Sequence, residues 1–313
     1  MADPNKAILA PLIYYDLLER PLTALEVFKY LWSLGPEISF FNVWQELKRS
    51  ESLPDFIQQK NGLYFLTNRE TLIKIRRKRM KLAQLKWKKL KKIGQYLALV
   101  PWLRLAAVTG SLTSHNTKEQ SDFDLLIVIK KNRLWLGRFL LTGLIGLLGK
   151  RRHSRLTQDR ICLNCYLTEN NLEITEQTKS RDFHSAQEYG RLTPVLETAN
   201  GIYENFINAN SWLTHFLKNY PWPNSRSAKK IQPPIIFIRL RQILEWLLNG
   251  RAGEAMEKIV AQWQNKRISK KRQNEQPDGP DQVFVSDYCL MFHPQSKSNK
   301  LMKEFDLKME QIS

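Results

Sequence analysis

The stretch LRLAAVTGSLTSHNTKEQSDFDLLIVIK, residues 103–130, decides the fold, because spacing and residue type agree there on one local structure. A first apolar run ends in TGS at 109–111, a polar segment follows, and DFD at 122–124 opens a second apolar run. Apolar runs of this length, bounded by turn residues, are typical of buried strands. We therefore predict a strand, a Gly-Ser turn, a short helix and a second strand.

Two aspartates are predicted to project from the same side of the second strand. Successive side chains alternate between the faces of a strand, so Asp122 and Asp124 lie about 7 Å apart on one face while Phe123 points into the core. Gly110 allows a backbone approach that a Cβ would block, and the unpaired amides at the start of the next helix, after Ser111, can bind a phosphate. A carboxylate pair beside a phosphate-binding turn suits a Mg²⁺-nucleotide site.

These residues resemble the nucleotidyltransferase superfamily that includes DNA polymerase β, its minimal bacterial members and the antibiotic nucleotidyltransferases. The resemblance covers residues 100–170 and consists of Gly110-Ser111, ten intervening residues, and Asp122-Phe123-Asp124 leading an aliphatic strand. It implies that Asp122 and Asp124 bind divalent metal, Mg²⁺ or Mn²⁺, and that Gly110 and Ser111 bind the phosphates of a nucleoside triphosphate (NTP).

The resemblance also implies a third carboxylate on a later strand, where it would activate the acceptor hydroxyl. The candidate strand is RICLNCYL, residues 160–167, which carries Asn164 where an acid is expected. An asparagine carbonyl can bind a metal weakly but cannot take a proton. Either the base is another residue, with Asp159 and Glu173 as candidates, or the activity is reduced or lost.

Length and charge set the range of functions. A chain of 313 residues can form two or three domains, and its formal net charge of +19 implies a polyanionic partner such as nucleic acid, nucleotides or an anionic membrane surface. Three cysteines make no disulfide framework, so a reducing, cytoplasmic location is expected, and the N-terminus shows no secretion signal. Cys162 and Cys165, three apart on a strand, are expected on opposite faces and in the core.

The first 66 residues predict three short helices and a hairpin. Helices are expected over 7–18, 27–32 and 40–49, the second of them opened by a capping box at 23–26. Two β runs flank Asn61-Gly62, a strong hairpin signal. Three helices followed by a hairpin resemble a winged helix, a fold that binds DNA or serves as a protein-interaction module.

A long basic helix is predicted over residues 68–98. Its apolar stripe faces the core, and its cations cover the remaining surface beside a single acid, Glu70. The cations are Arg69, Lys74, Arg76, Arg77, Lys78, Arg79, Lys81, Lys86, Lys88, Lys89, Lys91 and Lys92. This number of cations exceeds what solubility requires. Segment 69–92 is therefore a candidate contact surface for the phosphates of a nucleic acid.

The rest of the chain is predicted to be mainly helical. Residues 134–149 are mostly apolar but shorter than the roughly 20 that span a bilayer, so we expect a helix covering the sheet and no integral membrane segment. Residues 182–217, with interruptions at Gly190 and at Thr193-Pro194, and residues 235–248 and 253–263 are expected to be helical. Residues 266–280 are expected to form a loose connector, and 283–292 to be strand or helix.

We predict a multidomain α+β protein. It comprises a winged-helix-like module at 1–67, a basic connecting helix at 68–100, a nucleotidyltransferase core with a mixed sheet of the polymerase β type at 101–180, a helical region at 181–265, and a loose connector with a C-terminal segment at 266–313. The expected reaction transfers a nucleoside monophosphate from NTP to an acceptor and releases pyrophosphate. Two alternatives remain: a catalytically silent nucleotide- or nucleic-acid-binding regulator, and a scaffold or peripheral-membrane protein. Acceptor, base preference and oligomeric state are not predicted.

Overall fold

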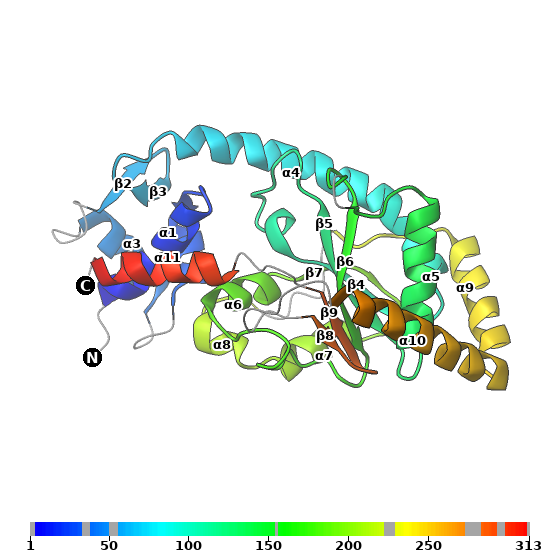
Figure 1. Cartoon of the computed structure of the whole chain (residues 1–313). Coiled ribbons are helices and arrows are strands. Elements are labelled where there is room, and N and C mark those ends of the chain that lie inside the picture. Colours follow the sequence, from blue (N-terminus) through cyan, green and yellow to red (C-terminus); the bar gives the residue numbers. More distant parts are fainter. Residues whose placement is uncertain are drawn as a thin grey trace.

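In the computed structural model of the chain, the described residues form two β-sheets, which one long helix connects (Figure 1). The structure describes residues 4–32, 38–49, 56–153, 156–221, 229–272, 283–292 and 298–311. Both helices and strands occur in each half of the molecule, and the larger sheet has parallel and antiparallel neighbours. The predicted α+β class is therefore confirmed.

The N-terminal part contains three helices and a small antiparallel sheet. Its elements are α1 (Pro4–Leu17), β1 (Leu22–Thr23), α2 (Ala24–Lys29), α3 (Phe40–Arg49), β2 (Ile57–Lys60) and β3 (Leu63–Leu66), and its strand order is β1-β3-β2. The capping box is confirmed, because Thr23 Oγ1 accepts from Glu26 N and Glu26 Oε2 accepts from Thr23 N. Asn61 and Gly62 have φ of 54° and 74°, the left-handed values that a tight hairpin turn requires.

Helix α4 (Leu72–Gly94) connects this part to the larger sheet, as Figure 1 shows, and a 3₁₀ turn, η1 (Gln95–Leu99), follows it. The predicted long helix is thus confirmed, but the prediction that its cations all face outward is wrong. Arg76, Arg79 and Lys86 lie on the buried face, whereas Met80 and Leu85 of the predicted apolar stripe are exposed.

The larger sheet has six strands in the order β7-β4-β5-β6-β9-β8. They are β4 (Leu103–Val108), β5 (Phe123–Ile129), β6 (Ile161–Thr168), β7 (Thr193–Glu197), β8 (Phe284–Val285) and β9 (Cys289–Met291). Among the strand pairs that the structure describes, β5 and β6 alone run parallel. Their connection includes α5 (Leu134–Leu147), whose buried residues pack into the core on one face of the sheet, as predicted for the apolar segment at 134–149.

The sheet separates two apolar cores. One contains Leu125 and Ile127 together with residues of α4, η1 and α5. The other contains Leu126 and Val128, residues of α6 (Phe183–Gly190), α7 (Ile202–Ala209) and α8 (Leu213–Phe216), and residues of α1 and α2. The second core therefore continues from the N-terminal part onto the sheet, and it also includes Phe305 of α11 (Ser298–Gln311).

The structure refines three predictions about the later part of the chain. Within 182–217, the predicted interruption at Thr193-Pro194 is the start of an edge strand, β7, a position that tolerates Pro194 because its missing N–H is not needed by a second neighbour. The predicted loose connector is helical as far as Arg272, the end of α10 (Arg251–Arg272), and residues 273–282 lie outside the described ranges. Segment 283–292 contributes β8 and β9, so the sheet extends beyond the predicted core at 101–180.

The prediction that Cys162 and Cys165 lie on opposite faces is also wrong. Cys162 pairs with Asp124 and Cys165 with Leu126, so two residues of β6 stand opposite one residue of β5. Such a β-bulge shifts the alternation by one and brings both cysteines to the same face. Among the helices in the described ranges, none is both long and apolar enough to cross a membrane.

Candidate functional site

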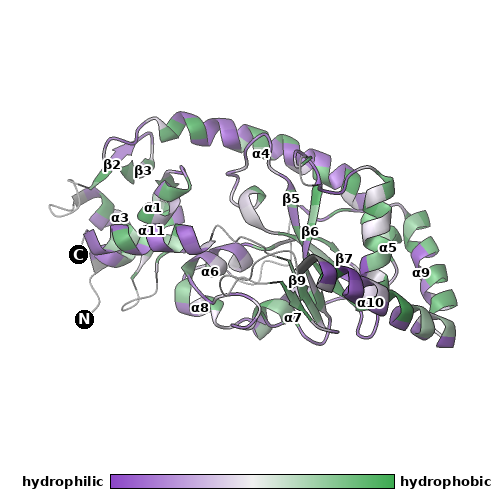
Figure 2. Cartoon of the chain, in the orientation of Figure 1, coloured by the Kyte–Doolittle hydropathy of each residue, from purple (hydrophilic) through white to green (hydrophobic). Residues whose placement is uncertain are grey.

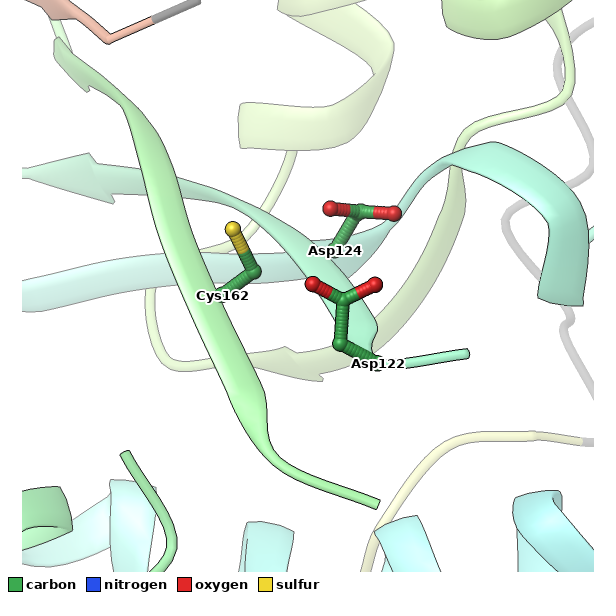
Figure 3. A group of neighbouring side chains, drawn as sticks. All are labelled: Asp122, Asp124 and Cys162. Atoms are coloured by element: carbon green, nitrogen blue, oxygen red, sulfur yellow. The ribbon is translucent and has the colours of Figure 1, made fainter. Parts of the chain in front are cut away.

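Asp122 and Asp124 lie side by side at the start of β5, as predicted, and Cys162 of β6 joins them. One ligand atom from each of the three side chains lies within 4.8 Å of the others, and Figure 3 shows the three side chains next to one another on the two neighbouring strands. All three are on the side of the sheet that carries Leu126, because two-residue spacing along β5 returns to the same face.

The Gly-Ser turn packs directly against this pair. Thr109 N donates to Asp124 O over 3.0 Å at the end of β4, and Gly110 then starts a single 3₁₀ turn, η2 (Gly110–Leu112), with φ of +69°. A Cβ on Gly110 would lie 2.9 Å from Asp124 Oδ2. The hydroxyls of Thr113 and Ser114 hold the turn by donating to the carbonyls of Gly110 and Ser111. The structure thus brings the predicted turn and carboxylates together.

An arginine supplies the positive charge of the site. Arg152 Nη1 lies 2.8 Å from Asp122 Oδ2 and donates to Cys162 Sγ over 3.3 Å. The pKa of Asp124 is raised to about 7, first by burial and then by the charges of Asp122 and Glu188, and Arg152 opposes this rise. Burial, followed by the charges of Asp124 and Asp122, raises the pKa of the Cys162 thiol to about 12. The thiol is therefore protonated at neutral pH.

Sequence reasoning missed Arg152, Cys162 and Glu188. Arg152 belongs to a run of cations at 150–152 that gave no sign of a specific partner, and Glu188 lies on α6, where it joins the site only through the fold. The proximity of Cys162 to the aspartates could have been predicted if the sequence had indicated the bulge in β6. The position of Cys162 near the start of the strand that follows the aspartate strand was the available sign.

The predicted substitutes for a third carboxylate lie elsewhere. Asn164 follows Cys162 by two residues within the bulge, and its backbone carbonyl accepts from Phe292 N over 2.8 Å. Asp159 binds Lys86 and Lys89 at 2.7 and 2.5 Å. Glu173 pairs with Arg181. Among the described residues, Asp122, Asp124 and Cys162 form the only three-membered cluster of possible metal ligands. Cys162 is the residue of β6 that pairs with Asp124, so the strand position beside Asp124 holds a thiol.

Two carboxylates in this arrangement fit a hard divalent cation. Carboxylate oxygens are the ligands that Mg²⁺ and Mn²⁺ prefer, with water or phosphate oxygens completing the shell. Asp122 Oδ2 is buried and accepts no hydrogen bond, although Arg152 Nη1 lies 2.8 Å from it. Burial and then the charges of Asp122 and Glu188 raise the pKa of Asp124, and a bound cation would stabilise the negative charge of the carboxylate pair. A protonated Cys162 adds no ligand for a hard cation. The residues that would hold the metal are therefore Asp122 and Asp124.

The basic helix presents a second candidate surface. Three of its cations are committed to internal contacts: Arg76 binds Glu26, Arg79 binds Glu19, and Lys86 binds Asp159. The exposed cations of α4 remain available to a polyanion. They are Lys74, Arg77, Lys78, Lys81, Lys88, Lys89 and Lys92, of which Lys89 shares Asp159.

Comparison of the chain with protein-family models, with curated proteins and with solved structures gives no match. The site consists of a carboxylate pair on one strand, a glycine turn packed against it, and a neighbouring guanidinium, within a mixed sheet. Groups of this kind could together hold a metal ion and a negatively charged ligand.

Proposed function

We propose that this chain is a metal-dependent nucleotidyltransferase of the polymerase β type, which moves a nucleoside monophosphate from NTP to an acceptor hydroxyl. The observation that carries the proposal is the packing of Gly110, which has a left-handed φ, onto Asp124: a Cβ on Gly110 would lie 2.9 Å from Asp124 Oδ2, so the carboxylate would have to shift. A glycine adopts this φ without strain and lets the backbone of the turn approach the carboxylate pair this closely. A triphosphate bound by the turn would thus lie directly over Asp122 and Asp124.

Each group has a defined role in the proposed reaction. Asp122 and Asp124 hold Mg²⁺ or Mn²⁺, which supplies neutralisation of the phosphate charge when bound. The Gly110-Ser111 turn orients the triphosphate, and Arg152 offers a guanidinium to the same phosphates. The acceptor oxygen bonds to the α-phosphorus as the bond to the β-phosphate oxygen breaks, and pyrophosphate leaves. The proton of the acceptor goes to solvent, because the protonated thiol of Cys162 cannot take it.

The N-terminal part and α4 would present a nucleic acid to this site. The order α1-β1-α2-α3-β2-β3 with strand order β1-β3-β2 is consistent with a winged-helix module, as the sequence predicts. Helix α4, which carries the exposed cations, runs from this part along the larger sheet (Figure 1), and its cations suit phosphate contacts. We therefore propose a nucleic acid as the preferred acceptor or ligand.

A catalytically silent nucleotide binder is the second candidate function. It is favoured by one observation: a thiol occupies the strand position beside Asp124, and Asn164 supplies no base further along β6. Such a protein would bind NTP through the same turn and carboxylates without releasing pyrophosphate.

The test incubates the purified protein with Mg²⁺ or Mn²⁺ and each α-labelled NTP, with and without total cellular RNA and a small-molecule extract. Transfer of label and release of pyrophosphate are measured for the native protein, for Asp122→Asn/Asp124→Asn, and for Glu119→Gln as a control that removes an exposed acid of the adjoining loop. We expect transfer in the native and control proteins and none in the double variant.

Metal-dependent NTP binding without transfer, lost in the double variant, would establish the silent binder instead. Binding that is equal in the native protein and the double variant would refute the site. Cys162→Asp then asks whether a carboxylate at this strand position introduces or increases transfer, as expected if the thiol limits the reaction.

A further inference from the structure

Helix α9 (Ile235–Leu248) turns its apolar side outward. The residues that face the protein include Arg241 and Glu245, while Ile236, Leu240, Ile243 and Leu247 form an exposed stripe along the helix. Trp246, beside this stripe, is 77% exposed. Figure 2 shows α9 as a largely hydrophobic helix at the edge of the molecule. This is the reverse of the usual arrangement, in which a surface helix faces solvent with its polar side.

The orientation of α9 is fixed by polar contacts with the core. Glu245 Oε1 accepts from Trp102 N over 2.7 Å and lies 3.8 and 3.9 Å from the guanidinium groups of Arg104 and Arg241. Turning the apolar stripe inward would break these contacts. The exposed stripe is therefore a stable feature of the fold.

Helix α10, which contacts α9, also exposes apolar side chains. Met256, Ile259 and Trp263 are exposed at helical spacing. The opposite side of α10 is anchored, because Glu257 accepts from Trp135 N and Leu136 N over 2.8 Å. Large exposed apolar patches mark interaction surfaces in soluble proteins, so we treat the exposed apolar side chains of these two helices as a candidate interaction surface.

The charges around the patch identify its partner. Through residue 270, the exposed charged side chains of α9 and α10 are one acid, Glu254, and six cations. The cations are Arg239, Arg251, Lys258, Lys266, Arg267 and Lys270. A second copy of the chain would bring two such sets of like charges together, which is unfavourable. A nucleic acid would leave the apolar stripe uncovered in water, since its accessible surface is mainly phosphate and sugar.

We propose that α9 and α10 bind the surface of an anionic lipid bilayer, with the apolar stripe in the interface and the cations on the lipid phosphates. Interfacial helices combine Lys and Arg with Trp, Leu and other apolar residues in this way, and tryptophan prefers the depth of the headgroups. Neither helix spans the bilayer in this arrangement. The site of Asp122 and Asp124 would then work on a membrane surface.

The test is flotation of the full chain with vesicles of phosphatidylcholine alone or with 30% phosphatidylglycerol, which sets the vesicle charge. The test variant is Ile243→Glu/Leu247→Glu, and the matched control is Leu85→Glu/Leu307→Glu, whose leucines are 56% and 58% exposed against 53% and 57% in the test pair. Both variants add two negative charges, so they differ only in where the apolar groups are lost. Thermal unfolding checks that each is folded.

We expect binding to the anionic vesicles, weaker binding to the neutral ones, and a loss of about 100-fold in the test variant only, since each removed side chain forfeits its burial in the interface. An equal loss in both variants would show adsorption by charge alone and overturn the proposal. Absence of binding to anionic vesicles would overturn it too. A dimer in sedimentation velocity that only the test variant dissociates would assign the patch to a second copy instead. None of these outcomes depends on nucleotidyl transfer.

Discussion

Replacing Lys86 by methionine tests whether α4 holds the segment that leads into the aspartate pair. Lys86 is 1% exposed, and its ammonium donates to Ser121 O, Glu119 O and Asp159 Oδ1 over 2.7, 2.8 and 2.7 Å. Methionine keeps the length of the side chain but leaves these three acceptors without their donor. Hydrogen bonds to a charged group contribute about 1.5–3 kcal/mol each, and the avoided cost of burying the ammonium offsets part of the loss. We expect a net destabilisation of about 3 kcal/mol.

Urea unfolding followed by circular dichroism measures this loss, and for a chain of this size it corresponds to about 6–12 °C in Tm. Lys88→Met is the matched control, because Lys88 is exposed on the same helix and should change stability by less than about 0.5 kcal/mol. Equal stabilities of the two variants would refute the reasoning, since they would show that the buried contacts of Lys86 contribute no more than a solvated cation.

Three further outcomes are expected. Burial alone would raise the pKa of Glu26, but two arginines overcome it and lower the value from 4.5 to about 2; the ion pairs therefore stabilise the fold above pH 4.5 and this contribution fades as pH falls toward 2. Urea unfolding from pH 5 to 2 should lose about 3 kcal/mol less in Glu26→Gln than in the native protein. Gly110→Ala should cost about 1–2 kcal/mol because of its left-handed φ and the contact with the carboxylate, whereas the helical control Gly143→Ala, with open space around it, should stabilise by up to about 1 kcal/mol; both are read from Tm. Burial raises the pKa of all three cysteine thiols, so Ellman's reagent at pH 8 should label them slowly in the native protein and completely in guanidinium, and rapid native labelling would contradict their burial.

Local signals in the sequence predicted the local structure well. The Asn61-Gly62 turn, the capping box at Thr23 and the strand-turn-strand at 103–130 each depend on residues close together in the chain, and all are present in the structure. The face shared by Asp122 and Asp124 followed from the alternation of a strand, which is also a local property.

What could not be predicted depends on residues distant in sequence. The cations of α4 that turn inward do so because Glu19, Glu26 and Asp159 meet them from other elements. The bulge that brings Cys162 beside Asp124 depends on the register between two strands, which no single segment fixes. Glu188 reaches the site through tertiary packing alone. The sequence therefore predicted the turn and the two aspartates of the candidate site. It did not predict Arg152, Cys162 or Glu188, the groups around the aspartates.

The first and last helices of the described chain, α1 and α11, pack against each other. Phe305 of α11 stacks on Phe183 and packs edge-to-face on Tyr14 of α1, and Lys308 lies 3.2 Å from Asp16. During synthesis, α1 leaves the ribosome long before α11 does. The apolar side of α1 therefore cannot be fully buried until most of the chain has emerged. A nascent chain of this protein thus exposes apolar surface until late in translation, the state in which chaperones bind.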